Sequence, residues 1–361
     1  MVNKSRVAIM EEALKPLTFE QISVPTLQDG EILVRNTFAT LCKSDINTFI
    51  GKRQEKTPTI LGHEIVGKIV ESSPSAPKVD EMGKSLSLGD RITWGIFASD
   101  PKDPLSKQGI PQKAADLFKY GHEQHSNENT LHGGLAEYTI LRKNTPIVRL
   151  PDTIDDPLAA IINCSLATVA GAFRLAEDIQ QKRVFIIGTG MLGIVACAMA
   201  SLKGAQQVIG LDINEARLEK AMSFGATHVY NAQSEWDQML KDDSARDFPV
   251  DLVFDFSGVP EALERSLNLL DIGGKAIWVG GTFPQRDMTI NAEHIIRRLI
   301  TIKGLHNYNR EDLVSAVEFI EQAQHSFPFK DLIYTQGSLD NVNEAFQTAI
   351  NDQPFRVGLV C

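Results

Sequence analysis

The sequence predicts an α/β protein with two parts, an antiparallel barrel-like β domain and a domain with a doubly wound parallel sheet. The chain has 361 residues, which is enough for two domains that each bury a core. Near residue 157 the hydrophobic pattern changes from short alternating runs to apolar runs separated by amphipathic ones. Beyond that change, the glycine-rich stretch GTGMLG separates an apolar run from a helix-like run.

The first part, up to about residue 155, has the pattern of short strands separated by turns. Its strand-like runs are RVAIM, EILVRNTFAT, GHEIVGKIVES, GDRITWGIF and AEYTILR. Glycine, proline and aspartate stand between these runs, as they do in hairpins and loops. This combination predicts an antiparallel, barrel-like domain.

The second part alternates helices and buried strands. DPLAAIINCSLATVAGAFRLA predicts a helix, and the apolar runs that follow it are RVFIIG, QQVIGLD, DLVFDFSG and GKAIWVGG. Strands rich in valine and isoleucine that are joined by helices form parallel sheets. The tail from about 305 contains helices and a last strand, RVGLV, which could extend this sheet or fold back on the first domain.

Composition narrows the classes of partner and the location. The net charge is −10 and no lysine- or arginine-rich run occurs, so nucleic acid and anionic membranes are not expected partners. The N-terminus lacks a signal-peptide core, and no segment approaches the ~20 apolar residues of a spanning helix. The 4 cysteines are too few for a disulfide framework. These features favour the cytoplasm.

The glycine-rich stretch predicts a dinucleotide-binding turn of the Rossmann type. Gly188, Gly190 and Gly193 follow the G-x-G-x-x-G order between a strand and a helix, with Met191 and Leu192 inside the turn. Glycines permit a tight turn there, and the helix N-terminus offers free N–H groups to a pyrophosphate. A glycine turn that holds no dinucleotide is the alternative.

The strand after the turn favours NAD over NADP. It ends at Asp212, where a carboxylate can accept hydrogen bonds from the adenosine ribose and would repel a 2′-phosphate. Arg217 lies nearby and is expected to cover the adenine rather than to override Asp212.

A group of polar residues in the first part indicates a metal site. Cys42, His63 and Glu64 occur within one short span, and Cys164 begins the helix that leads into the second part. Thiolate, imidazole and carboxylate are zinc ligands, and a catalytic site uses three of them with one open position. The alternative is that the cysteines are small core residues and the histidine is structural.

Several motifs in a fixed order make the chain similar to the zinc-dependent medium-chain alcohol dehydrogenases. They are CKSD at 42–45, GHEIVGKIV at 62–70, GDR at 89–91, GGLAEY at 133–138, CSLAT at 164–168 and GTGMLG at 188–193. The resemblance implies a GroES-like catalytic domain, residues 1–160 and 305–361, and a Rossmann NAD-binding domain, residues 161–304. It therefore implies that the tail returns to the first domain.

The resemblance also implies roles for individual residues. Cys42, His63 and Cys164 match the catalytic zinc ligands, and Glu64 matches a carboxylate that sits behind the metal or replaces its water. Three positions match contacts to the nicotinamide, namely Thr168, Val279 and Gly280.

Three further residues match the surroundings of the zinc ligands in the family. Ser44 matches the hydroxyl that hands the substrate proton onward, and Asp45 matches the carboxylate that orients the ligating histidine. Arg356 matches a tail arginine that pairs with this acid, although a solvated surface charge is the alternative.

The sequence departs from the family pattern at two places. Asn47 stands where many relatives have a histidine that completes the proton relay. The four cysteines of the structural zinc are absent, because their spacing falls on Asp100, Asp103, Ser106 and Ala114. The resemblance thus predicts one zinc per chain; whether the two aspartates form a salt-bridged replacement with Lys102 and Lys107 stays open.

The resulting expectation is a zinc-dependent oxidoreductase that transfers a hydride between an alcohol or polyol and NAD. The stretches TFIGKRQEKTPTILGHE, GIPQKAADLFKYGHE and GLHNY are similar to a branch of the family associated with phosphonate catabolism. A zinc-free enzyme resembling quinone reductases and a non-catalytic nucleotide-binding relative are the alternatives. A small-molecule substrate and a homodimer or homotetramer are the expected partners.

Overall fold

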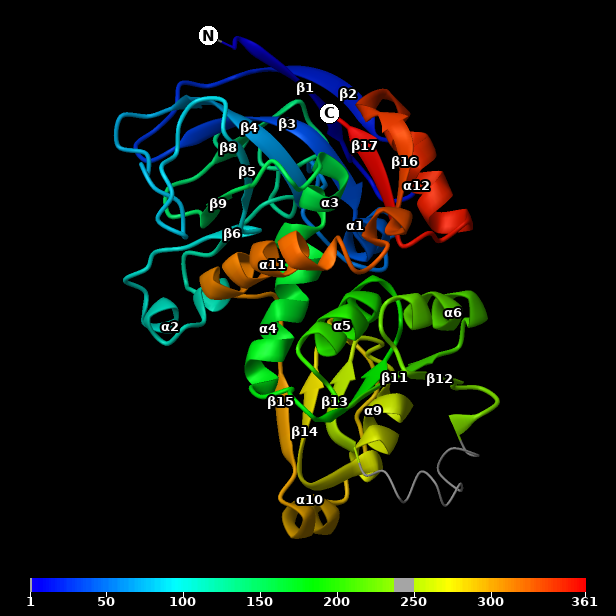
Figure 1. Cartoon of the computed structure of the whole chain (residues 1–361). Coiled ribbons are helices and arrows are strands. Elements are labelled where there is room, and N and C mark those ends of the chain that lie inside the picture. The colour runs from blue at the N-terminus through cyan, green and yellow to red at the C-terminus, as the bar shows by residue number, and fades with distance from the viewer. Residues whose placement is uncertain (1, 237–249) are drawn as a thin grey trace. The chain divides into compact units, whose positions relative to one another are not determined.

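The structure, a computed structural model, describes residues 2–236 and 250–361 and divides the chain into two compact units (Figure 1). The first unit consists of Met1–Ala167, Tyr308–Glu321 and Phe329–Cys361. The second consists of Thr168–Asn307 and Gln322–Pro328. The tail therefore belongs mainly to the first unit, and the second unit is an insertion within it.

The first unit is built on a seven-stranded sheet with the order β16-β17-β3-β4-β5-β9, in which β8 also pairs with β3. The strands are β3 (Ile32–Leu41), β4 (Glu64–Ser72), β5 (Arg91–Trp94), β8 (Tyr138–Leu141), β9 (Ile147–Arg149), β16 (Ile333–Ser338) and β17 (Arg356–Val360). Register shifts bend β3 against β4 at two places. Such bulges increase the twist and help a sheet to curl, which agrees with the barrel-like prediction.

The tail strand answers the question that the sequence left open. β17 pairs antiparallel with β3, with Val357 opposite Leu41, and Figure 1 shows the two strands side by side. Helix α12 (Val342–Asn351) covers this part of the sheet, and its Phe346 stacks on Phe49 of α1 (Lys43–Phe49) with ring centroids 4.5 Å apart. The tail is thus packed into the core of the first unit.

Short elements complete the first unit. Two small sheets pair β1 (Lys4–Ile9) with β2 (Thr18–Ser23) and β6 (Phe97–Ala98) with β7 (Phe118–Lys119). The helical elements are α2 (Pro104–Lys107), η1 (Pro111–Lys113), α3 (Asp156–Ala160), the π-helical turn η2 (Ile162–Leu166), η4 (Phe329–Leu332) and η5 (Leu339–Asn341). Helix α11 (Arg310–Ala323) ends two residues inside the second unit.

The second unit contains a six-stranded sheet with the order β12-β11-β10-β13-β14-β15, in which every neighbouring pair is parallel. This is the strand order of a Rossmann domain, with β10 as its first strand. The strands are β10 (Arg183–Ile187), β11 (Gln207–Asp212), β12 (His228–Asn231), β13 (Val250–Asp255), β14 (Leu270–Trp278) and β15 (Thr301–Gly304). The helical elements are α4 (Ala167–Ala176), α5 (Met191–Leu202), α6 (Glu215–Ser223), α9 (Pro260–Ser266), η3 (Leu267–Leu269) and α10 (Ala292–Arg298).

The expectation that no segment approaches the ~20 apolar residues of a spanning helix was wrong. The helical run Asp156–Ala176 has 21 residues and a mean hydropathy of 1.6, so it is long and apolar enough to cross a membrane by length and composition. Within its most apolar window, 78% of the residues are buried inside the protein. A run of this kind is typical of a core helix, and its apolar character is explained by burial.

The segment at 100–116, where the family pattern places a structural zinc, is held by backbone hydrogen bonds to aspartate side chains. The Asp103 carboxylate accepts hydrogen bonds from the amides of Leu105 at 2.8 Å, Ser106 at 3.3 Å and Ala115 at 3.3 Å. Among the described residues, no ion pair joins Asp100 or Asp103 to Lys102 or Lys107. The question that the sequence left open, whether these aspartates and lysines form a salt-bridged replacement, is therefore answered in the negative for the described residues.

Candidate active site

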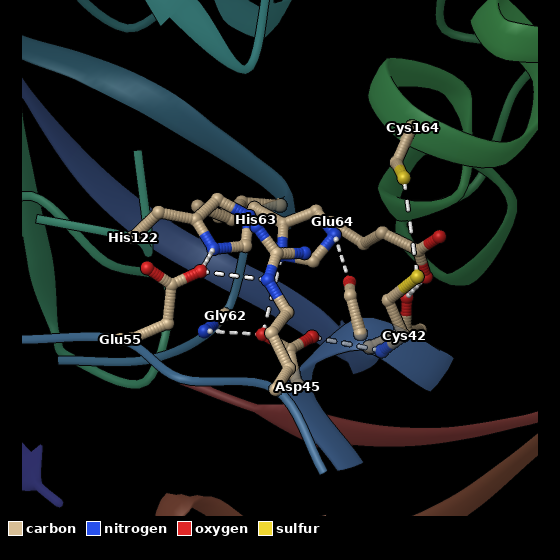
Figure 2. Close-up of polar contacts among 12 residues, drawn as sticks. Cys42, Asp45, Glu55, Gly62, His63, Glu64, His122 and Cys164 are labelled. Atoms are coloured by element: carbon tan, nitrogen blue, oxygen red, sulfur yellow. Dashed lines mark hydrogen bonds and ion pairs between the residues drawn. The ribbon is translucent and has the colours of Figure 1, made fainter. Parts of the chain in front are cut away.

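The three predicted zinc ligands come together in the first unit. Cys42 follows β3 and caps α1, His63 immediately precedes β4, and Cys164 lies in the π-helical turn η2. Their ligand atoms all lie within 4.8 Å of one another, and the two sulfur atoms are 4.0 Å apart (Figure 2). Cys42 and His63 are buried, whereas Cys164 is partly exposed.

Asp45 fixes the orientation of His63. Its Oδ1 lies 3.2 Å from Nδ1 of the His63 ring, and the carboxylate also accepts from the amides of Cys42 at 2.9 Å and Gly62 at 3.2 Å (Figure 2). Since a carboxylate only accepts, Nδ1 carries a proton, and Nε2 is the nitrogen that faces the ligand group and can bind a metal once it has lost its own proton. A ligating histidine is held in this way in metal sites.

Ser44 lies on the ligand side of this histidine. Its hydroxyl oxygen is 3.3 Å from Nε2 of His63, and its side chain is partly exposed. A hydroxyl there can exchange a proton between a group bound at the ligand atoms and solvent.

The predicted partner of Arg356 was wrong. Arg356 pairs with Glu64 instead of Asp45, through Nε to Oε2 at 2.6 Å and Nη2 to Oε1 at 2.9 Å. The same carboxylate accepts from the hydroxyls of Ser165 at 2.7 Å and Thr40 at 2.6 Å. Arg356 is only 4% exposed, so it is not a solvated surface charge.

Glu64 lies beside the ligand group but not in it. Both of its oxygens are engaged by Arg356, Ser165 and Thr40, and the three ligand atoms that converge are those of the cysteines and the histidine. Arg356 also lies 3.7 Å from the sulfur of Cys42. A positive charge there stabilises a thiolate at Cys42.

The electrostatics at Cys42 favour metal binding. The hydrogen bond from the Cys164 thiol, the charge of Arg356 and the imidazole of His63 hold the pKa of Cys42 well below its usual range. The thiolate is the form that binds metals. Burial opposes a charge on His63, yet Asp45 and the Cys42 thiolate raise its pKa well above the ordinary value, so a metal that binds at Nε2 has to displace a proton.

The residues present fit a zinc ion. Two sulfurs that are each about 2.3 Å from a tetrahedral zinc lie about 3.8 Å apart. The observed separation of 4.0 Å is close to that value. Two thiols and an imidazole with a fixed tautomer are a donor set that zinc takes in catalytic sites.

The sequence analysis missed a second polar group beside the ligands. The ring of His122 lies 4.8 Å from the ring of His63, and Nδ1 of His122 is 3.2 Å from Glu55 (Figure 2). Glu55 also pairs with Arg53 at 2.7 Å. No motif in the sequence connects His122 with residues 42–63.

The glycine turn of the second unit has the geometry that the motif predicts. Gly188 has a φ of +84°, and a Cβ at Gly193 would lie 1.9 Å from the carbonyl oxygen of Gly188. Only glycine fits there. Gly190 caps α5, which begins at Met191 with Leu192 as its second residue, so the amides of its first turn point into the glycine turn.

Asp212 lies at the end of β11, next to this turn. Its Oδ2 accepts from the amide of Thr189 at 2.8 Å, and its Oδ1 accepts from the amide of Asn214 at 3.0 Å. Arg217 is close by, since its Nη1 is 3.9 Å from where a Cβ at Gly190 would lie. The carboxylate is thus fixed and the guanidinium lies over the turn.

The remaining predicted cofactor residues also belong to the second unit. Val279 and Gly280 follow β14, at the edge where β10 and β11 also end. A Cβ at Gly280 would lie 2.3 Å from the amide nitrogen of Gly258, so this loop is closely packed. Thr168 is the second residue of α4 and is 9% exposed. Ligands of parallel sheets bind at the carboxyl ends of the strands.

Comparison with known families identifies the family to which the two units belong. Residues 28–152 match the family described as alcohol dehydrogenase GroES-like domain, and residues 192–322 match the family described as zinc-binding dehydrogenase. The two matches together span more than half of the chain.

The chain belongs to the zinc-dependent medium-chain dehydrogenase family. This confirms the predicted family and the fold class of a GroES-like domain with a Rossmann domain. As a member, it is a dehydrogenase that uses zinc and a nicotinamide dinucleotide. The finer resemblance to the branch associated with phosphonate catabolism stays a prediction.

Individual members of this family resemble the chain over nearly its whole length. The L-threonine 3-dehydrogenase of Pseudoalteromonas translucida is 26% identical over 92% of this chain and 93% of its own. The L-threonine 3-dehydrogenase of Colwellia psychrerythraea is 27% identical, with the same coverage of 92% and 93%.

Solved structures of alcohol dehydrogenases have the same fold as this chain. An alcohol dehydrogenase of Thermotoga maritima has a TM-score of 0.91 at 26% identity and covers 99% of each chain. The benzyl alcohol dehydrogenase of Acinetobacter calcoaceticus has a TM-score of 0.86 at 22% identity, again over 99% of each chain, which supports the fold.

Proposed function

We propose that this dehydrogenase oxidises an alcohol or polyol to the carbonyl compound with NAD, or catalyses the reverse reduction, at the site formed by Cys42, His63 and Cys164. The observation that carries the proposal is the convergence of these three ligand atoms, with the hydroxyl of Ser44 3.3 Å from the free nitrogen of His63. A structural cluster of cysteines would not need a hydroxyl at that position.

The zinc ion and the nicotinamide cofactor have different tasks in this reaction. When bound, zinc would act as a Lewis acid toward the substrate hydroxyl, and the nicotinamide would supply the hydride acceptor. Cys42, His63 and Cys164 would hold the zinc, and Asp45 keeps the His63 tautomer in which Nε2 faces it.

The proton that leaves the hydroxyl must be carried away. We assign its first acceptor as Ser44, which passes a proton on as it takes one up. Asn47 cannot take up a proton at neutral pH, so the path from Ser44 ends in solvent. The buried pair of Glu64 and Arg356 keeps a compensated charge beside the thiolates without taking part in the proton transfer.

The dinucleotide is assigned to the second unit. We assign the pyrophosphate to the glycine turn Gly188–Gly193, the ribose to Asp212, the adenine to Arg217 and the nicotinamide to Thr168, Val279 and Gly280. The fixed carboxylate of Asp212 supports NAD over NADP. The guanidinium of Arg217 over the turn is the feature that could favour NADP instead.

Two alternatives are less well supported. A zinc-free enzyme similar to quinone reductases has no need for two thiols and an imidazole within 4.8 Å. A non-catalytic relative would not need the Ser44 hydroxyl beside His63.

We propose that the protein is located in the cytoplasm, where its 4 free cysteines stay reduced. We also propose that it forms a homodimer or homotetramer.

The proposal is tested on purified, zinc-loaded protein with NAD and a panel of alcohols and polyols, by following the absorbance of the reduced cofactor. The decisive variant is Cys164→Ser. Cys197→Ala is its matched control, because Cys197 is a fully buried cysteine of helix α5 that is not one of the three ligands. Cys164→Ser should lose turnover and zinc but keep dinucleotide binding, whereas Cys197→Ala should keep all three. Full activity and zinc content in Cys164→Ser would refute the assignment.

A further inference from the structure

The ring of His122 lies against the ring of the predicted zinc ligand His63. The two ring centroids are 4.8 Å apart, and the ring planes are tilted by 34° (Figure 2). The side chain of His122 is 7% exposed and that of His63 is 2% exposed. Because buried rings at this distance are packed together, the position of one ring limits the movement of the other.

Gly121 allows the two histidines to come this close. It has a φ of +72°, a conformation that favours glycine. A Cβ at this position would lie 2.5 Å from the carbonyl oxygen of Gly62 and 3.3 Å from the Cβ of His63. The backbone that precedes His122 is therefore in direct contact with the backbone that precedes the metal ligand.

Hydrogen bonds hold the loop that carries His122 in place. The hydroxyl of Thr59 donates to the carbonyl of Glu123 at 2.7 Å, and the amide of His125 donates to the carbonyl of Pro58 at 2.7 Å. Thr59 and Pro58 lie in the segment that leads to the metal ligand. The loop is thus fixed to the same stretch of chain that positions the ligand.

Glu55 fixes the imidazole of His122 itself. Nδ1 of the ring donates to Oε1 of Glu55 at 3.2 Å, since a carboxylate only accepts. The same oxygen lies 2.7 Å from Nε of Arg53, and the side chain of Glu55 is 15% exposed. The ring of His122 therefore has a fixed rotation as well as a fixed position.

His63 is supported on two sides by these contacts. The hydrogen bond between its Nδ1 and Asp45, 3.2 Å long, fixes one edge of the ring. A contact at one edge does not fix the tilt of a ring about that edge, and His122 limits this tilt by lying against the ring face. The tilt matters because zinc needs its ligands in tetrahedral directions.

We propose that His122, held by Glu55, is a positioning residue that keeps the His63 ring oriented for the zinc ion. The inference rests on the proposed function, because it requires His63 to bind the metal with Cys42 and Cys164. Loss of a group that orients a metal ligand typically weakens metal binding by about 10- to 100-fold. A histidine that served only the fold would change stability when it is replaced, and the folded variant would bind zinc as wild type does.

The test measures how readily a competing chelator removes zinc from the zinc-loaded protein. His122→Ala removes the ring and should weaken zinc binding by about 10-fold or more. His122→Phe keeps a ring against His63 and should recover a large part of the affinity. His125→Ala is the matched control, because His125 belongs to the same loop and its Nδ1 has no hydrogen-bond partner among the described residues. This control should bind zinc as wild type does.

Replacement of zinc by cobalt(II) gives a second readout, which needs no turnover. The visible absorption of cobalt(II) depends on the geometry of its ligands. His122→Ala should change this spectrum relative to wild type, and His122→Phe should change it less. The Tm of each zinc-loaded variant shows that it is folded when its affinity is measured.

The outcomes separate the inference from the proposed function. If folded His122→Ala binds zinc as tightly as wild type, or if its cobalt spectrum is unchanged, the inference is overturned and the proposed function stands. If His122→Ala does not fold, Glu55→Ala decides, because it frees the His122 ring from its partner: wild-type zinc affinity overturns the inference, and weaker binding by the folded variant supports it. If wild type itself binds no zinc after reloading, the proposed function is overturned and the inference falls with it.

Discussion

Arg356 and Glu64 form a buried ion pair beside the zinc ligands, and the contact could not be predicted from the sequence. The two residues are 292 positions apart, and two acids, Asp45 and Glu64, were possible partners. The register of the sheet decides between them. Val357 is opposite Leu41 on β3 and Glu64 is opposite Thr40, which brings the guanidinium to Glu64.

This pair leads to a stability prediction. Arg356→Met leaves the buried Glu64 carboxylate without its partner, which should lower the free energy of unfolding by about 3–5 kcal/mol. The double variant Arg356→Met/Glu64→Gln removes both charges and should recover a large part of that loss. Denaturant unfolding of the zinc-loaded proteins measures both values. A single variant as stable as wild type would show that the pair contributes little.

Asp212 gives a prediction for cofactor choice. Asp212→Ala removes the carboxylate that repels a 2′-phosphate, so the ratio of kcat/KM for NADP to that for NAD should rise by about 10-fold or more. Initial rates with each cofactor measure the ratio, with Glu219→Ala of the exposed face of α6 as the control. A wild type that already prefers NADP would contradict the assignment and point to Arg217.

At the scale of elements, the order and type of helices and strands could be predicted, because the spacing of the apolar residues differs between helices and strands. Buried runs such as RVFII became the parallel strands, and the glycine motif lies between β10 and α5. The position of the tail could not be predicted from composition, since RVGLV fits the edge of either sheet.

The segment at 100–116 is the element for which the structure supplies a new explanation. Asp103 binds three backbone amides there, on both sides of the turn, where relatives are expected to hold a structural zinc. Burial opposes the shift, but these amides lower the pKa of the Asp103 carboxyl below its ordinary value. Asp103 therefore replaces a metal by hydrogen bonds.

Asp103→Asn should lower the Tm at pH 7, because an amide is a weaker acceptor for these three amides. A carboxyl whose pKa is lower in the folded protein stabilises above its unfolded pKa and loses this effect as the pH falls through the folded value. The difference in Tm between wild type and Asp103→Asn should thus shrink below about pH 4. Asp100→Asn is the control, since among the described residues the Asp100 carboxylate accepts from one amide, that of Lys102. Equal effects of both variants would contradict the explanation.

At the scale of the whole molecule, the prediction concerns metal content: about one zinc per chain. Within residues 2–236 and 250–361, one group of three or more histidine, cysteine, aspartate or glutamate side chains could hold a metal ion. It consists of Cys42, His63 and Cys164, whose ligand atoms lie within 4.8 Å of one another. A structural zinc needs four such ligands, and Asp100, Asp103, Ser106 and Ala114 offer two carboxylates that already accept backbone amides.

Elemental analysis of dialysed wild type and Cys164→Ser measures this content. We expect about one zinc per chain in wild type and much less in Cys164→Ser, because loss of one of three protein ligands leaves too few to hold the ion through dialysis. Two tightly held zincs in wild type would show a second site that hydrogen bonds at Asp103 do not explain. A wild type without zinc after reloading would overturn the catalytic assignment itself, since the residues that hold the metal also position Ser44 and the hydroxyl that is to be oxidised.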